Sequence, residues 1–122
     1  MCLVKEIMLA GEAGSSAVAR VAVNRPSAAP TGAATAQTAE KLNPASPTAT
    51  HVVATAYATT QGTLSTNDVI MIPFNAFGGV VRWLAAPGQE IVVGTQGAVA
   101  YLITRSRSGT STVSGHIVVE EA

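Results

Sequence analysis

From about residue 52 to residue 122, short apolar or alternating runs are separated by Gly, Pro, Asn and Ser. The strongest run is 68–74 (DVIMIPF), which is apolar on both faces, as in a strand that is covered on both sides. Pro73 cannot donate a ladder hydrogen bond, so it marks a sheet edge or a bulge. The same pattern predicts further strands at 51–60, 80–85, 90–93, 98–105 and 112–121.

The spacing of the turn signals predicts the fold class. They recur roughly every 8–12 residues, the spacing of an all-β sandwich or barrel. Pro87-Gly88 has the chemistry of a tight turn, and Gly115 marks a bulge or a closely packed site in the last strand. No segment of this half has helical periodicity. We therefore expect residues 51–122 to form an all-β domain, a jelly-roll-like antiparallel β-sandwich.

Residues 1–50 have a different composition, which is rich in Ala, Thr, Ser and Pro. A strand or helical turn is expected at 2–10 and a strand at 17–23, before Pro26 and Pro30 interrupt the pattern. Residues 31–42 are compatible with a marginal Ala-rich helix or an extended segment. These features predict an extended, partly ordered N-terminal arm over residues 1–50 that lies on a neighbouring molecule.

Composition and charge limit the classes of function that the sequence supports. Hydrophobic residues make up 48% of the chain and charged residues 11%, which favours an assembly whose contacts cover the surface. A surface of Thr, Ser, Gln and Asn is the alternative. The net charge of +0 argues against nucleic-acid binding. No apolar run is long enough for a membrane span, and residues 1–10 do not resemble a signal peptide, so synthesis in the cytoplasm is expected.

Reactive side chains are sparse. The lone Cys2 cannot form an internal disulfide, and His51 and His116 have no other ligand at metal-binding spacing. Glu120 and Glu121 are adjacent on a strand and so point to opposite faces. Ser114 and His116 share a face without a third residue to orient the imidazole. We expect no catalytic residues, no metal and no cofactor, and hence no enzyme activity.

Residues 80–122 contain predicted strands separated by Gly and end in a Gly-x-Ile-x-Val-Glu segment at 115–120. In this sequence pattern they resemble small β-sandwich proteins of tailed phages. These are capsid decoration (cement) proteins and fibre-head domains. The resemblance covers about residues 52–122. It implies a homotrimer that sits on a capsid lattice in the virion, with an arm that reaches the neighbouring shell proteins and with no catalytic residues.

The leading hypothesis is therefore a non-enzymatic virion structural protein that binds the major capsid protein and stabilises the shell as an oligomer. Trp83 is either a core residue or an interface anchor. The residues expected at partner contacts are Val18, Val21, Val23 and Arg25 in the arm, with Phe77 and Trp83 near the oligomer axis. Two alternatives are a fibre-head or lectin-like module that binds a glycan through residues 105–110, and a small β-barrel enzyme of cupin type.

Overall fold

The computed structural model describes residues 1–31, 34–37, 39–51, 53–57, 64–97, 102–108 and 112–121. No α-helix occurs within these ranges, and all the strand pairs described there are antiparallel, which confirms the prediction of an all-β, antiparallel fold. The strands are β1 (Cys2–Glu12), β2 (Val18–Pro26), β3 (Ala34–Gln37), β4 (Val53–Tyr57), β5 (Leu64–Asn75), β6 (Phe77–Leu84), β7 (Ile91–Val93), β8 (Ile103–Ser108) and β9 (Val113–Glu121).

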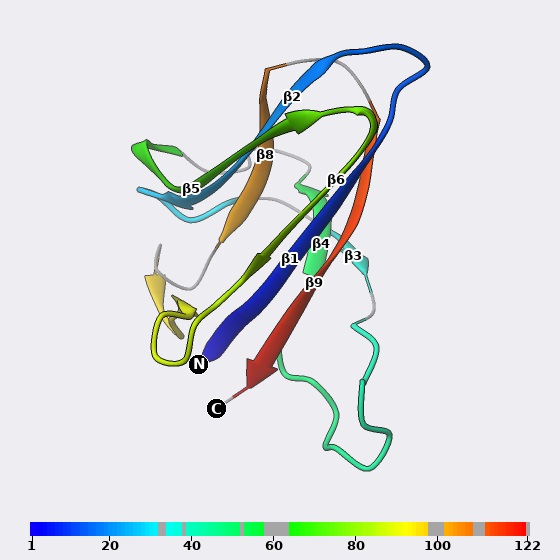
Figure 1. Cartoon of the computed structure of the whole chain (residues 1–122). Helices are drawn as coiled ribbons and strands as arrows, with labels where there is room; N and C mark the ends of the chain where they lie inside the picture. Colours follow the sequence, from blue (N-terminus) through cyan, green and yellow to red (C-terminus); the bar gives the residue numbers. More distant parts are fainter. Residues whose placement is uncertain are drawn as a thin grey trace.

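Two sheets make up most of the fold. In the first, which we call sheet A, β1 lies between β9 on one side and β6 with β7 on the other (Figure 1). In the second, sheet B, the order is β5-β2-β8. The short strands β3 and β4 pair separately with each other.

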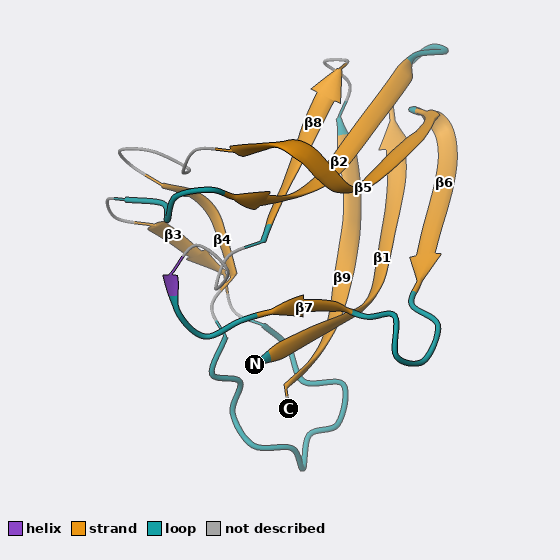
Figure 2. Cartoon of the chain, turned by 90° about the vertical axis from the view of Figure 1, so that its left-hand side faces the viewer, coloured by secondary structure: helices purple, strands orange, loops and turns teal. Residues whose placement is uncertain are grey.

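The chain passes from sheet A to sheet B between β1 and β2, and from sheet B to sheet A between β5 and β6, so each of these pairs forms an arch with one strand in each sheet (Figure 2). The β1–β2 arch is central in both sheets, with β5 and β6 on one side of it and β8 and β9 on the other. This arrangement is a sandwich-like pair of sheets. It does not show the strand order of a jelly roll, which stays a prediction.

The hydrophobic core lies where the inner faces of the two sheets meet. The buried residues of this cluster are Val4, Ile7, Leu9, Val21, Val23, Ile72 and Ile91. Five of them come from β1 and β2, so the middle arch supplies most of the core. Burial of these branched side chains is the main favourable contribution to folding that the structure shows.

The first 26 residues therefore differ from the expected N-terminal arm. Residues 2–12 and 18–26 are central strands of this fold. The alternation along β1 changes phase at a register shift between Val4 and Glu6, where Lys5 is the extra residue of a bulge. This shift made a strand and a helical turn equally compatible with the sequence. Residues 34–37 form β3, and residues 32, 33 and 38 of the expected arm lie outside the described residues.

Strand β5 also differs from its expectation as a strand covered on both faces. It is an edge strand of sheet B, and the side chains of Val69 and Met71 are 41% and 42% exposed. On the inner face of β5, the apolar side chain of Ile72 packs into the core. The prediction that Pro73 marks an edge is confirmed by the position of β5 in the sheet.

Close backbone approach joins the two sheets at their corners. Ala76 is fully buried between β5 and β6, and its N–H donates to the Ala17 carbonyl at 2.7 Å. The Ala76 carbonyl in turn accepts from the Ala13 N–H at 2.9 Å. Gly11 packs so closely on Ala76 that a Cβ there would overlap its backbone. Two arches are thus fastened to each other where they turn.

Candidate interaction surface

The face of sheet A that points away from sheet B is the surface on which charged and apolar side chains gather. Paired residues of an antiparallel ladder share a face. Met8 pairs with both Arg82 and His116, whereas the buried Ile7 pairs with Trp83 and Ile117. We call the side that carries Met8 the outer face. Its members are Lys5, Glu6, Met8 and Ala10 of β1, Val80, Arg82 and Leu84 of β6, and Ser114, His116, Val118 and Glu120 of β9.

The bulge in β1 places two adjacent charged residues on this face. Val4 and Ile7 are buried on the inner side, and Lys5 and Glu6 between them are only partly covered. A regular strand would turn one of the two inward. The bulge therefore allows a Lys-Glu pair at the centre of a sheet without burying either charge.

Glu6 is held between the two flanking strands. Its Oε2 accepts from an Arg82 guanidinium nitrogen at 2.8 Å, and its Oε1 lies 3.0 Å from His116 Nε2. The hydrogen bond from Arg82, followed by that from His116, lowers the pKa of Glu6 to about 2. Since a carboxylate with so low a pKa is a poor proton acceptor near neutral pH, Glu6 is suited to joining strands and unsuited to general base chemistry.

Lys5 forms a second charged group at the other end of the face. Its ammonium lies 2.8 Å from Glu90 Oε1 and 2.9 Å from Glu120 Oε2. The hydrogen bond to Glu90 and then that to Glu120 raise the pKa of Lys5, and the bond from Lys5 lowers the pKa of Glu90. These contacts link β1 to β9 and to the residue that precedes β7.

Apolar side chains flank the charged groups. Val80 is 66% exposed and Leu84 is 58% exposed, on either side of Arg82 along β6. At the corner that precedes them, Phe77 is 58% exposed, and Val18 at the start of β2 is 63% exposed. Exposed large apolar residues that lie along one strand and its corner are typical of a contact surface.

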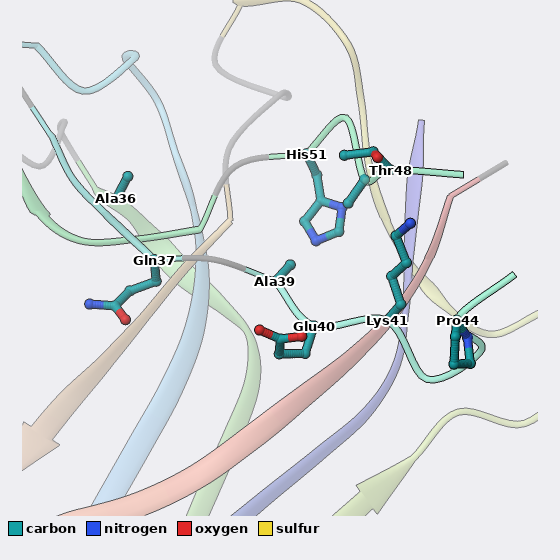
Figure 3. Close-up of a pocket in the computed structure, with 9 residues that line it drawn as sticks. Ala36, Gln37, Ala39, Glu40, Lys41, Pro44, Thr48 and His51 are labelled. Atoms are coloured by element: carbon teal, nitrogen blue, oxygen red, sulfur yellow. The ribbon is translucent and has the colours of Figure 1, made fainter. Parts of the chain in front are cut away.

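A separate open hollow of about 620 Å³ lies beside the segment that follows β3 (Figure 3). It is lined by Ala36, Gln37, Ala39, Glu40, Lys41, Pro44, Thr48, Ala49 and His51. Four of these residues are Ala or Pro, and the other five carry an amide, a carboxylate, an ammonium, a hydroxyl and an imidazole. The lining is thus mixed in polarity, and its imidazole, that of His51, is already bonded to Glu121.

Glu121 fastens this segment to the end of β9. Its Oε1 accepts from the backbone N–H groups of Thr50 at 2.7 Å and His51 at 2.6 Å, and it lies 2.6 Å from His51 Nδ1. The side-chain hydrogen bond from His51, followed by its backbone N–H, lowers the pKa of Glu121 to about 2. His51 thus has a structural partner that sequence spacing did not indicate.

The described residues contain no cluster of three or more His, Cys, Asp or Glu side chains that could hold a metal ion. Cys2 is buried, and desolvation raises the pKa of its thiol, which disfavours the nucleophilic thiolate. In the part of the chain that the structure describes, no helix is long and apolar enough to cross a membrane.

The six residues expected at partner contacts differ in how far the structure buries them. Val18 and Phe77 are exposed at the corner. Val21 and Val23 differ from the expectation because the structure buries them in the core, where a partner cannot reach them. Trp83 packs partly buried against that core, and Arg25 is partly covered in β2.

The residues of the alternative glycan site are described only in part. Residues 105–108 belong to β8, without a description of their side chains, and residues 109 and 110 lie outside the described residues. The residues that sequence reasoning missed are Lys5, Glu6, Val80 and Leu84. Val80 and Leu84 lie in the strand predicted at 80–85, where Arg82 is the one polar residue, and no sequence spacing connects Lys5 or Glu6 to their partners.

Comparison with known proteins gives no relative for this chain, since no protein-family model, no curated protein and no solved structure matches it.

Proposed function

We propose that the protein is a non-enzymatic structural protein of a virion, which binds the major capsid protein and stabilises the shell as a homo-oligomer. The observation that carries the proposal is the group of exposed apolar side chains at the corner and along β6, in a chain with only 11% charged residues. The virion setting rests on the resemblance of residues 52–122 to phage decoration proteins.

The charge pattern of the outer face supports a binding role. Glu6 is countered by Arg82 and also bonds His116, whereas Glu90 and Glu120 share the single ammonium of Lys5. Each of these carboxylates keeps a hydrogen-bonding partner within the chain when another protein surface covers the face. Many such contacts, repeated by symmetry over a shell, add up to substantial stabilisation.

We propose the corner residues Val18 and Phe77 as the contact with the shell. Both were expected at partner contacts from the sequence, and both are more than half exposed. Neither side chain belongs to the hydrophobic core. Their apolar surface is thus available to a partner without rearrangement of the fold.

The test is to measure the heat resistance of shells assembled from the major capsid protein, with and without this chain. We expect a higher melting temperature with the chain, and expect the gain to be lost with the double variant Val18→Ser and Phe77→Ser. The matched control is Val92→Ser, an apolar residue of β7 that is 40% exposed. Equal melting temperatures with and without the unmodified chain would refute the proposed function.

A further inference from the structure

The backbone of β6 presents an open edge. Within the described residues, β6 pairs with β1 on one side and with no strand on the other. The Ala85 N–H donates to the Lys5 carbonyl at 2.9 Å, and this fixes the alternation of the ladder that precedes it. The register then directs the N–H and C=O groups of Val80, Arg82 and Leu84 away from β1, onto the open edge.

The neighbouring edge strand β5 is blocked by its sequence. The bond from the Ala76 N–H to the Ala17 carbonyl sets the same alternation in β5, which places Pro73 among the residues that face outward from the sheet. Proline has no N–H to offer an added strand, and a proline at such a position is a known means of protecting an edge. The β5 edge is therefore interrupted near its C-terminal end.

The β6 edge lacks this protection. Its eight residues include no proline and a single charged residue, Arg82, which is bound to Glu6 at 2.8 Å. Strand β9 at the other side of sheet A carries His116, Glu120 and Glu121. Its last residue, Glu121, is also covered by the segment around His51. Of these three strands, β6 is the one that is both open and apolar.

We propose that β6 pairs with β6 of a second copy of this chain, antiparallel and about a two-fold axis at Arg82, so that sheet A continues across the dimer. The segment is self-complementary in this register. Val80 of one copy lies opposite Leu84 of the other on the outer face, and Val81 lies opposite Trp83 on the inner face. The two Arg82 residues meet at the axis, where each is already countered by Glu6 of its own chain.

This inference specifies the oligomer of the proposed function and does not depend on the shell. A two-fold contact of this kind is isologous and closes as a dimer. It differs from the homotrimer that the resemblance implies. The dimer can form even if the chain binds no capsid, and a failure of shell binding leaves it untouched, so the two proposals are tested separately.

The first experiment is light scattering on the full chain after size-exclusion chromatography. We expect a dimer for the unmodified chain and for Val80→Thr, which keeps the N–H and favours a strand. We expect a monomer for Val80→Pro, which removes an N–H from the open edge without a loss to the β1 ladder. Tryptophan fluorescence of Trp83 checks that the variant is folded. A trimer or a monomer of the unmodified chain overturns the proposal, as does a dimer of folded Val80→Pro.

A second experiment does not depend on the folding of the proline variant. Directly paired positions on neighbouring strands have Cβ atoms about 4.5–5.5 Å apart, within reach of a disulfide after small adjustments. A mixture of Val80→Cys and Leu84→Cys proteins is expected to form a mixed disulfide under mild oxidation, and each variant alone is expected to stay largely uncrosslinked. A mixture that forms no more disulfide than the single variants overturns the register and the proposal with it. A different outcome would identify another occupant of the edge. If the unmodified chain is a monomer and Val80→Pro prevents its binding to the shell, the β6 edge pairs with a strand of the shell protein.

Discussion

Asn24 Nδ2 donates to Asp68 Oδ1 at 2.8 Å across the β2–β5 ladder, at the point where the register of the two strands shifts. Asn24 is fully buried, and its amide also reaches the carbonyls of Ser65 and Asn67 at 3.1 and 3.2 Å. One side chain thus satisfies the groups that the irregular pairing releases. It fixes how the first half of β5 lies on the central strand.

Replacing Asn24 by Ala is expected to destabilise the protein by about 1–3 kcal/mol, because the carbonyl and carboxylate oxygens lose a buried donor. Chemical denaturation followed by circular dichroism measures the change. Asn24→Asp is the informative companion, since it sets a second carboxylate beside Asp68 and is expected to cost more at neutral pH than in mild acid. Unchanged stability of both variants would show that the Asn24 amide does not stabilise the irregular pairing of β2 with β5.

Gly11→Ala is expected to destabilise the fold by roughly 1–3 kcal/mol, since the added methyl group overlaps the Ala76 backbone and pushes two arches apart. Thermal unfolding compared with the unmodified chain is the measurement. Gly14→Ala is the control in the same turn region, because a Cβ there has nothing within 4 Å. Equal effects at Gly11 and Gly14 would contradict the close contact at the corner.

Ile7 and Ile117 are paired across β1 and β9 but differ in burial, at 1% and 47% exposed. Ile7→Ala is expected to cost about 2–5 kcal/mol, through the lost burial and the cavity that remains. Ile117→Ala removes the same atoms from a half-exposed site and is expected to cost clearly less. Urea denaturation of the two variants tests the difference. A larger loss of stability for Ile117→Ala than for Ile7→Ala would contradict the position of the core.

Stability in acid is expected to depend on Glu6. Its pKa in the folded chain is about 2, below the ordinary value of 4.5, so ionised Glu6 favours the folded state. This contribution is fully present above about pH 4.5 and is lost as the pH falls towards 2. Glu6→Gln is expected to lower stability at neutral pH and to flatten the acid dependence. Glu12→Gln on the same strand is the control, and parallel curves for Glu6→Gln and the unmodified chain would contradict the role of the ion pairs.

Local patterns predicted most of the strands in the second half of the chain, with two differences in their bounds. Strand β5 begins at Leu64, before the predicted 68–74, and β8 (Ile103–Ser108) overlaps the strand predicted at 98–105 only at 103–105, since residues 98–101 lie outside the described residues. The turn at Pro87-Gly88 is confirmed by the Gln89 N–H bond to the Ala86 carbonyl at 2.9 Å and by a φ of 80° at Gly88. Gly115 is confirmed as a closely packed site, since a Cβ there would overlap the Met8 carbonyl. The turn depends on residues that are neighbours in the chain, so the sequence shows it directly, whereas the close contact of Gly115 is with Met8 on another strand.

Other features depend on partners that are far away in the chain. Glu6 meets residues 76 and 110 positions later, and no spacing rule connects them. The bulge at Lys5 hid the strand character of β1 because it changes the phase of an otherwise regular alternation. The inner residues at 2, 4, 7 and 9 were visible as apolar positions, but only the pairing with β9 shows that they share a face.

The pairing of β1 with β9 has a consequence for how the chain reaches its native state. Cys2 is paired with Glu121, and most other contacts of the two sheets also join distant segments. Such a topology has a high contact order, and folding slows as contact order rises. On the ribosome, β1 is made before β9 and must wait for the strands between them before β9 can cover its side. Changes in β1 are therefore expected to alter the rate of folding as well as the final stability, and through both the yield of native protein.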